Sequence, residues 1–119
     1  MKVLVVDDSK LARLTLIKTL KEYEPSAEVL EAENGAIAVD LFKAENPRVV
    51  FLDLTMPVMD GYEALERMMQ IHSKAQVVVV SADIQMQAQE RVLGLGAKLM
   101  VPKPINSNKM LDVLQQLVF

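Results

Sequence analysis

Five short apolar runs divide the chain, and a segment with helical spacing of apolar residues follows each of them. Four of the runs are almost purely hydrophobic: Val3–Val6, Val49–Leu52, Val77–Val80 and Leu99–Val101. Runs of this length without polar alternate residues are typical of strands buried on both faces of a parallel sheet. The remaining run, Ala27–Ala32, holds two apolar residues between glutamates, which indicates a short edge strand.

The first two intervening segments carry clear helix signals. Ser9 can cap a helix that Pro25 ends, and its apolar positions are Leu11, Leu14, Ile17 and Leu20. Asn34-Gly35 then precedes a second helix over Ala36–Glu45, which Asn46-Pro47 closes. The order strand, helix, strand, helix is therefore predicted for the first half of the chain.

The second half repeats this order. A polar loop with Pro57 and Gly61 leads into a helix from Tyr62 to His72, and Asp60 is interpreted as its cap. The next helix, Ile84–Leu93, is weakly amphipathic because glutamines surround its few apolar residues, and Gly94 and Gly96 follow it. The last helix has an apolar stripe made of Met110, Val113, Leu114, Leu117 and Val118.

Five strand and helix units predict an α/β fold with a doubly wound parallel sheet, right-handed crossovers and helices on both faces. A chain of 119 residues suits one compact domain, so residues 1–119 are interpreted as a single domain. Ligands of such sheets bind outside the carboxyl ends of the strands. That edge is where functional residues are expected.

Composition narrows the classes of function. The chain contains no cysteine, which excludes disulfides, thiolate zinc sites and a cysteine nucleophile. No segment resembles a membrane span or a signal peptide, so we expect a cytoplasmic protein without membrane insertion. The net charge is −3, and no basic stripe interleaved with aromatic residues is present. Direct binding to nucleic acid is therefore not expected.

Polar residues stand at the ends of the predicted strands. Asp7 and Asp8 follow the first run, Asp53 follows the third, Ser81 the fourth and Lys103 the last. Crowded carboxylates repel one another unless a cation lies among them, and carboxylate oxygens favour Mg²⁺, Mn²⁺ or Ca²⁺. Carboxylates, a lysine and a hydroxyl together favour phosphoryl transfer with Mg²⁺. Asp53, alone on a central strand, is the best candidate for a nucleophile.

At this point the whole chain resembles the receiver domain of two-component response regulators, most of all its stand-alone, chemotaxis-type members. The matching motifs are VVDDS (Val5–Ser9), DLTMPVMDG (Asp53–Gly61), Ser81-Ala82 and Lys103-Pro104. The resemblance implies a flavodoxin-like fold with five helices and the strand order 2-1-3-4-5. It also implies a phosphoacceptor signalling domain, which is no enzyme with a separate substrate but can catalyse its own phosphorylation and dephosphorylation.

The resemblance also assigns roles to residues. It implies that Asp53 accepts a phosphoryl group from a phosphohistidine of a sensor histidine kinase. Asp8 and Asp53 are expected to bind Mg²⁺, or Mn²⁺ in its place, with the Thr55 carbonyl as a further ligand and Asp7 acting through water. Ser81 matches the switch hydroxyl and Lys103 the phosphate-pairing lysine. Ala82 matches the small residue beside the phosphoryl group, and the Lys103-Pro104 bond is expected to be cis.

Signal output is the less conventional part of the match. Relatives commonly carry an aromatic switch residue three positions before the lysine, where this chain has Met100. Methionine is flexible enough to couple Ser81 to the surface in another way. Thr55 and Asp83 are expected to tune the lifetime of the phosphoryl group. The resemblance implies an output protein such as a flagellar-motor component or an adaptor in chemotaxis, with the chain acting as a monomer or a phosphorylation-dependent dimer.

Several alternatives remain open at this level. An Asp-nucleophile phosphohydrolase would use Asp53, but that class has a second Asp where Thr55 stands. The chain could also be a module that is never phosphorylated, or a receiver cut from a longer regulator, although Phe119 ends it without a linker. Ser81 could instead cap the helix near Ile84. His72 falls at the far end of its helix and is not expected to take part in the site.

Overall fold

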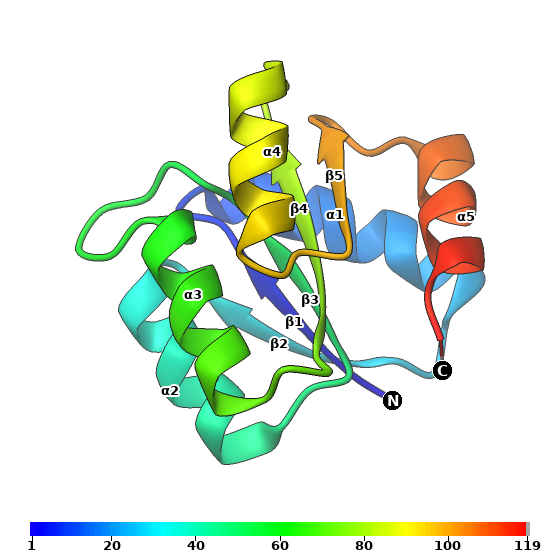
Figure 1. The fold of residues 1–119 in the computed structure, drawn as a ribbon. Helices are drawn as coiled ribbons and strands as arrows, with labels where there is room; N and C mark the ends of the chain where they lie inside the picture. The colour runs from blue at the N-terminus through cyan, green and yellow to red at the C-terminus, as the bar shows by residue number, and fades with distance from the viewer. Residues whose placement is uncertain (119) are drawn as a thin grey trace.

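Five parallel strands form one sheet in the order β2-β1-β3-β4-β5, which confirms the predicted fold class (Figure 1). The computed structural model describes residues 1–118, so Phe119 lies outside the described residues. The strands are β1 (Lys2–Val6), β2 (Glu28–Ala32), β3 (Val49–Leu52), β4 (Gln76–Ser81) and β5 (Leu99–Pro102). The predicted edge strand is β2, and β3 has the predicted bounds.

The helices alternate with the strands and cover both faces of the sheet (Figure 1). They are α1 (Lys10–Tyr23), α2 (Gly35–Glu45), α3 (Gly61–Ile71), α4 (Met86–Gly94) and α5 (Ser107–Gln116). Leu20 of α1 and Met110 of α5 pack in one apolar cluster. Phe42 of α2, Met68 of α3 and Val92 of α4 pack in another. Helices α1 and α5 therefore cover one face, and α2, α3 and α4 cover the other.

The two clusters explain why the strands carry continuous apolar runs. Along β1, Val3 and Val5 belong to the cluster under α1 and α5, whereas Leu4 and Val6 belong to the cluster under the other three helices. Successive side chains of a strand point to opposite faces. All four are at most 2% exposed, so these residues of β1 are shielded from water on both faces of the sheet.

Side-chain caps start four of the five helices. Ser9, Asn34, Asp60 and Asn106 each accept a hydrogen bond from a backbone N–H three residues later. These bonds satisfy amides that have no partner inside the helix. Helix α4 begins at Met86, and its cap residue, Gln85, makes no side-chain hydrogen bond to the helix. The interpretation of Ser81 as a cap for this helix is therefore wrong.

Three further sequence expectations need correction. Leu11 and Leu14 are 74% and 48% exposed, so the predicted apolar stripe of α1 is buried only toward its end. Val118 lies beyond α5 and is exposed. Helix α4 starts two residues later than expected and includes Gly94.

Among residues 1–118, no helix combines the length and the apolar character that a membrane crossing requires.

Candidate functional site

Two aspartates lie side by side at the carboxyl edge of the sheet. Val6 at the end of β1 is in register with Leu52 at the end of β3, so Asp7 and Asp53 are the next residues of neighbouring strands. The N–H of Asp53 donates to the carbonyl of Val6 at 3.0 Å, which continues the ladder past the strands. Both carboxylates are buried, with 7% and 6% of the residue exposed. The fold alone thus brings two acids together in a place with little water.

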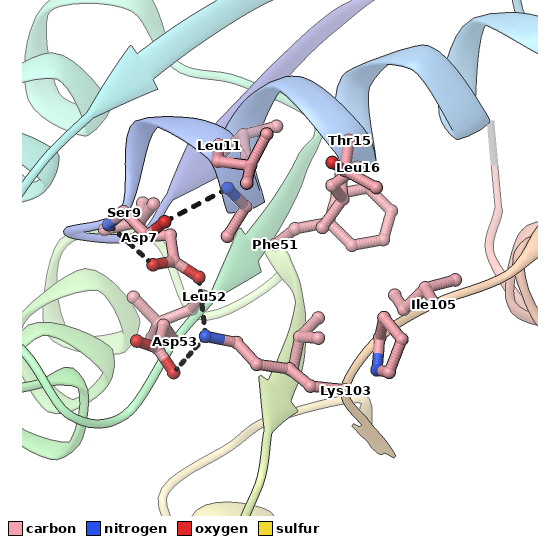
Figure 2. A pocket seen from close by; sticks show the side chains of 15 residues that line it. Asp7, Ser9, Leu11, Thr15, Leu16, Phe51, Leu52, Asp53, Lys103 and Ile105 are labelled. Carbon is pink, nitrogen blue, oxygen red and sulfur yellow. Dashed lines mark hydrogen bonds and ion pairs between the residues drawn. The ribbon is translucent and has the colours of Figure 1, made fainter.

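Lys103 bridges these two acids. Its Nζ lies 2.7 Å from Oδ2 of Asp7 and 3.3 Å from Oδ1 of Asp53 (Figure 2). The lysine follows β5, and its backbone N–H donates to the carbonyl of Ser81 at 3.0 Å, which fixes the start of the side chain. The Lys103-Pro104 peptide bond is cis, as the resemblance implied. One ammonium group therefore neutralises part of the charge of both aspartates.

Burial and mutual repulsion set the proton affinities in this cluster. Burial raises the pKa of Asp53, the negative charge of Asp7 raises it further, and Lys103 offsets part of both effects. Burial by itself would lower the pKa of Lys103, but its hydrogen bond to Asp7 and the charges of both aspartates raise it overall. The lysine thus stays protonated. Its positive charge does not fully offset the cost of ionising Asp53, because the pKa of Asp53 stays raised.

The cluster fits a hard divalent cation. Asp7, Asp8 and Asp53 each offer one oxygen, and the three oxygens lie within 4.8 Å of one another. Asp8 is exposed, whereas the other two are buried, so the group is open to solvent on one side. Carboxylate oxygens on an open, partly hydrated site are the ligand set that Mg²⁺ and Mn²⁺ prefer. The sequence prediction of these three acids as one group is confirmed in geometry.

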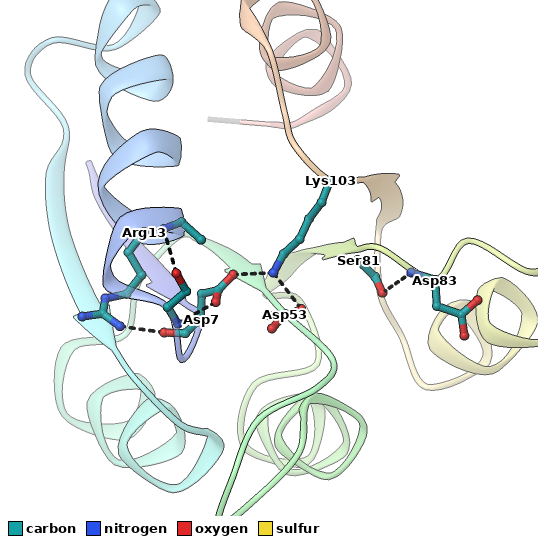
Figure 3. A network of polar contacts seen from close by, with 8 residues as sticks. Asp7, Arg13, Asp53, Ser81, Asp83 and Lys103 are labelled. Carbon is teal, nitrogen blue, oxygen red and sulfur yellow. Dashed lines mark hydrogen bonds and ion pairs between the residues drawn. The ribbon is translucent and has the colours of Figure 1, made fainter.

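Two backbone contacts at Asp7 were not anticipated from the sequence. The N–H of Ser9 donates to Oδ1 of Asp7 at 2.9 Å (Figure 2). Nη1 of Arg13 donates to the Asp7 carbonyl at 2.7 Å (Figure 3). From the sequence, Ser9 was predicted only as a cap, and Arg13 was given no role. Arg13 lies four residues, about one helical turn, after Ser9, and a cation in the first turn of the helix that follows the acidic pair is the signal that could have identified it.

Gly61 is a second residue whose role the sequence analysis missed. A Cβ at this position would collide with the carbonyl oxygen of Asp53 and with the backbone of Leu54. The absence of a side chain lets the first turn of α3 approach the backbone directly beneath the carboxylate of Asp53. The N–H of Gly61 also donates to the Leu54 carbonyl at 2.9 Å. Gly61 therefore helps to fix the position of the nucleophile candidate.

Ser81 lies at the same edge but takes no part in the ion pairs. It is the buried last residue of β4, and its hydroxyl accepts a hydrogen bond from the N–H of Asp83 at 3.0 Å (Figure 3). The carboxylate of Asp83 in turn accepts from the N–H of Gln85. The hydroxyl is thus engaged with the loop before α4, and this loop is connected to the start of that helix.

The remaining predicted residues surround the cluster at different depths. Thr55, Ala82 and Asp83 are exposed in the loops after β3 and β4. Met100 is half-buried in β5, in register with Val79, and packs against the cluster covered by α2, α3 and α4. His72 ends α3 and lines a pocket with Arg48 and Lys98, which precede β3 and β5 at the opposite edge of the sheet. The expectation that His72 is remote from the site is confirmed.

A cavity of about 350 Å³ adjoins the ion pairs. Asp7, Asp53 and Lys103 form its polar end, and apolar side chains such as Leu16 and Phe51 line the rest (Figure 2). This apolar wall offers no hydrogen bond to the carboxylates. It agrees with burial as the main cause of the raised pKa of Asp53.

Comparisons with known proteins converge on one family. A family model described as the response regulator receiver domain matches residues 3–115. The chemotaxis protein CheY of Bacillus subtilis (strain 168) is 35% identical over 115 residues, which cover 97% of this chain and 95% of that protein.

Solved structures agree in fold. Chemotaxis protein CheY4 of Vibrio cholerae superposes with a TM-score of 0.88 at 26% identity and covers 98% of both chains. CheY in a complex of CheX, CheY, BeF3 and Mg²⁺ from Borrelia burgdorferi superposes with a TM-score of 0.83 at 32% identity, over 98% of this chain and 85% of that one. The similarity therefore extends over almost the whole chain.

Proposed function

The chain belongs to the response regulator receiver domain family, and on this basis we propose that Asp53 accepts a phosphoryl group from a phosphohistidine of a sensor kinase. The observation that carries the proposal is the contact of Lys103 with both Asp7 and Asp53 at the carboxyl edge of the sheet. A lysine held there can pair with an oxygen of a phosphoryl group on Asp53 without moving far.

The transfer exchanges one bond to phosphorus for another. A carboxylate oxygen of Asp53 attacks the phosphorus atom while the bond from phosphorus to the histidine nitrogen breaks, and the electron pair of that bond stays on the nitrogen. Lys103 balances the negative charge that gathers on the phosphoryl oxygens. Loss of the phosphoryl group to water returns Asp53 to a carboxylate. The domain thus catalyses its own modification and acts on no separate substrate.

Asp7, Asp8 and Asp53 are the side chains that would hold Mg²⁺, with the Thr55 carbonyl as a further ligand and Asp7 acting through water. The ion would supply positive charge that stabilises the transferring phosphoryl group. The residues contribute a preorganised set of oxygens, because Ser9 and Lys103 already fix both oxygens of Asp7. Mn²⁺ fits the same donors.

Phosphorylation would shift the domain toward a second conformation. Ser81 exchanges its bond with the Asp83 N–H for one with the phosphoryl group, which leaves the loop before α4 free to move. Ala82, beside Ser81, leaves room for the phosphoryl oxygens. Met100 repacks with this loop in place of the aromatic side chain of other receivers. The surface of the last two strand and helix units then binds an output partner.

Chemotaxis is the pathway that the relatives favour. Relatives named for chemotaxis match nearly the full chain, and the solved complex from Borrelia burgdorferi holds a receiver with CheX, a second protein. We propose a cytoplasmic regulator that binds a flagellar-motor component or an adaptor, as a monomer or as a phosphorylation-dependent dimer. A pull-down with phosphorylated and unphosphorylated protein would identify the partner. Equal recovery of the same partners from both forms would contradict a phosphorylation-dependent output.

Acetyl phosphate and Mg²⁺ provide the direct test of the phosphoacceptor. Intact-mass spectrometry is expected to show one phosphoryl group on the wild type and none on Asp53→Ala. Asp40→Ala, an exposed carboxylate of α2, is the matched control and should be modified like the wild type. An Asp53→Ala variant that gains the phosphoryl mass would contradict the assignment.

The lifetime of the phosphoryl group provides a second test. Asp83 and Thr55 lie two residues after Ser81 and Asp53, and both are exposed. Changing either side chain to Ala is expected to change the rate of phosphoryl loss, because each borders the path by which water reaches the phosphorus atom. Unchanged rates in both variants would count against their role in turnover.

A further inference from the structure

Arg13 connects three elements beside the acidic cluster. From α1, its Nη1 donates to the carbonyl oxygen of Asp7 at 2.7 Å (Figure 3). Its Nε donates to Oε1 of Glu31 in β2 at 2.9 Å. Only 13% of the Arg13 side chain is exposed, compared with 41% for Glu31. The guanidinium group is therefore held in one orientation from both sides.

The carbonyl that Arg13 holds belongs to the peptide group between Asp7 and Asp8. Because a peptide group is planar, fixing its oxygen also fixes the direction in which the next residue leaves it. The side chain of Asp8 takes part in no hydrogen bond or ion pair with the rest of residues 1–118. The direction of this proposed metal ligand thus depends on its backbone, and Arg13 holds that backbone.

Arg13 differs from Lys103 in the atoms that it occupies. Lys103 pairs with carboxylate oxygens of Asp7 and Asp53, which are themselves candidate ligands. Arg13 uses a main-chain oxygen at the site and a carboxylate of β2 outside it. It therefore orders the acidic pair and leaves every carboxylate oxygen of the cluster available to a cation.

We propose that Arg13, oriented by Glu31, is a positioning residue for the divalent cation site, an inference that rests on the proposed function. It aligns the peptide group between Asp7 and Asp8 so that the Asp8 carboxylate meets the other two acids before a cation arrives. Partners of this kind outside the direct ligands change metal affinity about 10-fold to 100-fold.

The direction in which Arg13→Gln changes the metal affinity distinguishes a positioning role from a simple effect of charge. Arg13 is a cation next to an acidic cluster, so its charge alone repels Mg²⁺ or Mn²⁺. If charge were its only influence, Arg13→Gln would bind the metal more tightly than the wild type. Positioning predicts weaker binding by about tenfold or more.

The test measures the dissociation constant of Mn²⁺ with the full chain, from the electron paramagnetic resonance signal of the free ion. Arg13→Gln is expected to weaken binding about tenfold. Arg13→Lys should be nearly as weak, because the single nitrogen of a lysine cannot occupy the positions of both Nη1, which donates to the Asp7 carbonyl, and Nε, which donates to Glu31. Glu31→Gln should weaken binding severalfold and keep this effect in 0.5 M salt, where the Debye length is about 4 Å and the long-range influence of its charge is screened.

Glu45→Gln is the matched control for Glu31→Gln. Glu45 pairs with Lys2 at 3.0 Å and is 37% exposed, close to the values for Glu31, but it lies at the other edge of the sheet. It should leave Mn²⁺ affinity unchanged. Thermal unfolding of each variant, followed by circular dichroism, shows that the chain is folded, and Glu31→Gln carries the test if Arg13→Gln does not fold.

Two results would overturn the inference without touching the proposed function. Tighter or unchanged Mn²⁺ binding by Arg13→Gln would assign Arg13 a charge effect or none. Unchanged affinity in Glu31→Gln would remove the orienting role of Glu31. Failure of the proposed function looks different, because the wild type itself would then neither bind Mn²⁺ nor gain a phosphoryl group from acetyl phosphate.

Discussion

Each edge of the sheet holds one lysine between two carboxylates, but the two groups differ in their access to water. At the amino edge, Nζ of Lys2 lies 3.0 Å from Glu45 and 4.0 Å from Glu28, and all three side chains are well exposed. Exposed ion pairs of this type contribute about 0 to 1 kcal/mol. This group therefore lies on the surface, where water screens the ion pairs.

At the carboxyl edge the same chemistry is buried. The carboxylates of Asp7 and Asp53 are 9% and 8% exposed, and Lys103 is 29% exposed. Hydrogen bonds to acids raise the pKa of Lys103 and of Lys2 alike, and at the carboxyl edge burial also raises the pKa of Asp53. Burial thus makes the lysine and the two acids of this edge a group that further positive charge would stabilise.

Replacing the lysine at each edge should give the largest difference between the edges in the free energy of unfolding. Lys103→Met removes the ion-pair partner of two buried carboxylates and is expected to lower the free energy of unfolding by about 3 kcal/mol. Lys2→Met should leave it almost unchanged, because the side chain of Lys2 is exposed. Urea denaturation at neutral pH measures both. Equal losses in the two variants would show that burial does not distinguish the edges.

Divalent cations should stabilise the buried edge alone. Mg²⁺ at one hundred times its dissociation constant is expected to add about 2.7 kcal/mol to the free energy of unfolding, because it binds the folded state. Asp8→Asn should lose most of this gain, whereas Glu45→Gln should keep it. Thermal melts with and without EDTA provide the measurement. A gain of the same size in Asp8→Asn would remove Asp8 from the metal site.

Neutralising the proposed phosphoacceptor should make the protein more stable. The pKa of Asp53 is raised in the folded state, so its ionised form costs stability at neutral pH. Asp53→Asn is expected to gain about 1 kcal/mol at pH 7. The gain should shrink as the pH falls through the raised pKa and vanish below the ordinary value of 3.8, where Asp53 is protonated in both states.

Glu45→Gln is the control for that experiment and should show no such gain at pH 7, because Glu45 is solvated and paired with Lys2. The measurement is urea denaturation of the wild type, Asp53→Asn and Glu45→Gln from pH 7 to below pH 3.8. A destabilised Asp53→Asn at pH 7 would mean that the ion pair with Lys103 outweighs the cost of burial, which would reverse the interpretation of this edge.

The smallest contrast concerns backbone strain. Among residues 1–118, each edge has one residue other than glycine in the left-handed region, Asn46 (φ 47°) at the end of α2 and Val58 (φ 68°) in the loop after β3. Asparagine tolerates this conformation, but a β-branched residue is strained in it by roughly 1 kcal/mol. Val58→Asn should therefore raise stability by somewhat less than that, and Asn46→Val should lower it. A loss of stability in Val58→Asn would contradict stored strain in this loop.

The hydrophobic pattern and the turn residues were sufficient to predict the strands and helices along the chain, whereas the order of the strands within the sheet followed from the family resemblance. The run Val49–Leu52 is buried on both faces as β3. Its pairing with β1 places Asp7 and Asp53 side by side. The pattern was less informative for α1, because Leu11 and Leu14 have the spacing of core residues but remain exposed. Periodicity shows which residues share a face of a helix, and only the packed neighbours decide how much of that face is covered.

The parts of the candidate site made by side chains at strand ends could be predicted from the sequence. The hydrogen bonds that involve backbone groups could not. The carboxyl ends of parallel strands meet at one edge, so Asp7, Asp53 and Lys103 could be grouped from their positions alone. The bond from Arg13 to the Asp7 carbonyl could not, because it depends on the angle at which α1 leaves the strand. The bond of Ser81 to the Asp83 N–H likewise depends on the conformation of one loop.

Asp53 is the residue proposed to carry a phosphoryl group at the buried edge. The most direct test treats the protein with acetyl phosphate and Mg²⁺, reduces the product with borohydride, and locates the modified residue by peptide mass spectrometry. A single reduced residue is expected, at position 53, formed with Mg²⁺ and not with EDTA. Modification at another residue, or an equal yield in EDTA, would contradict this assignment.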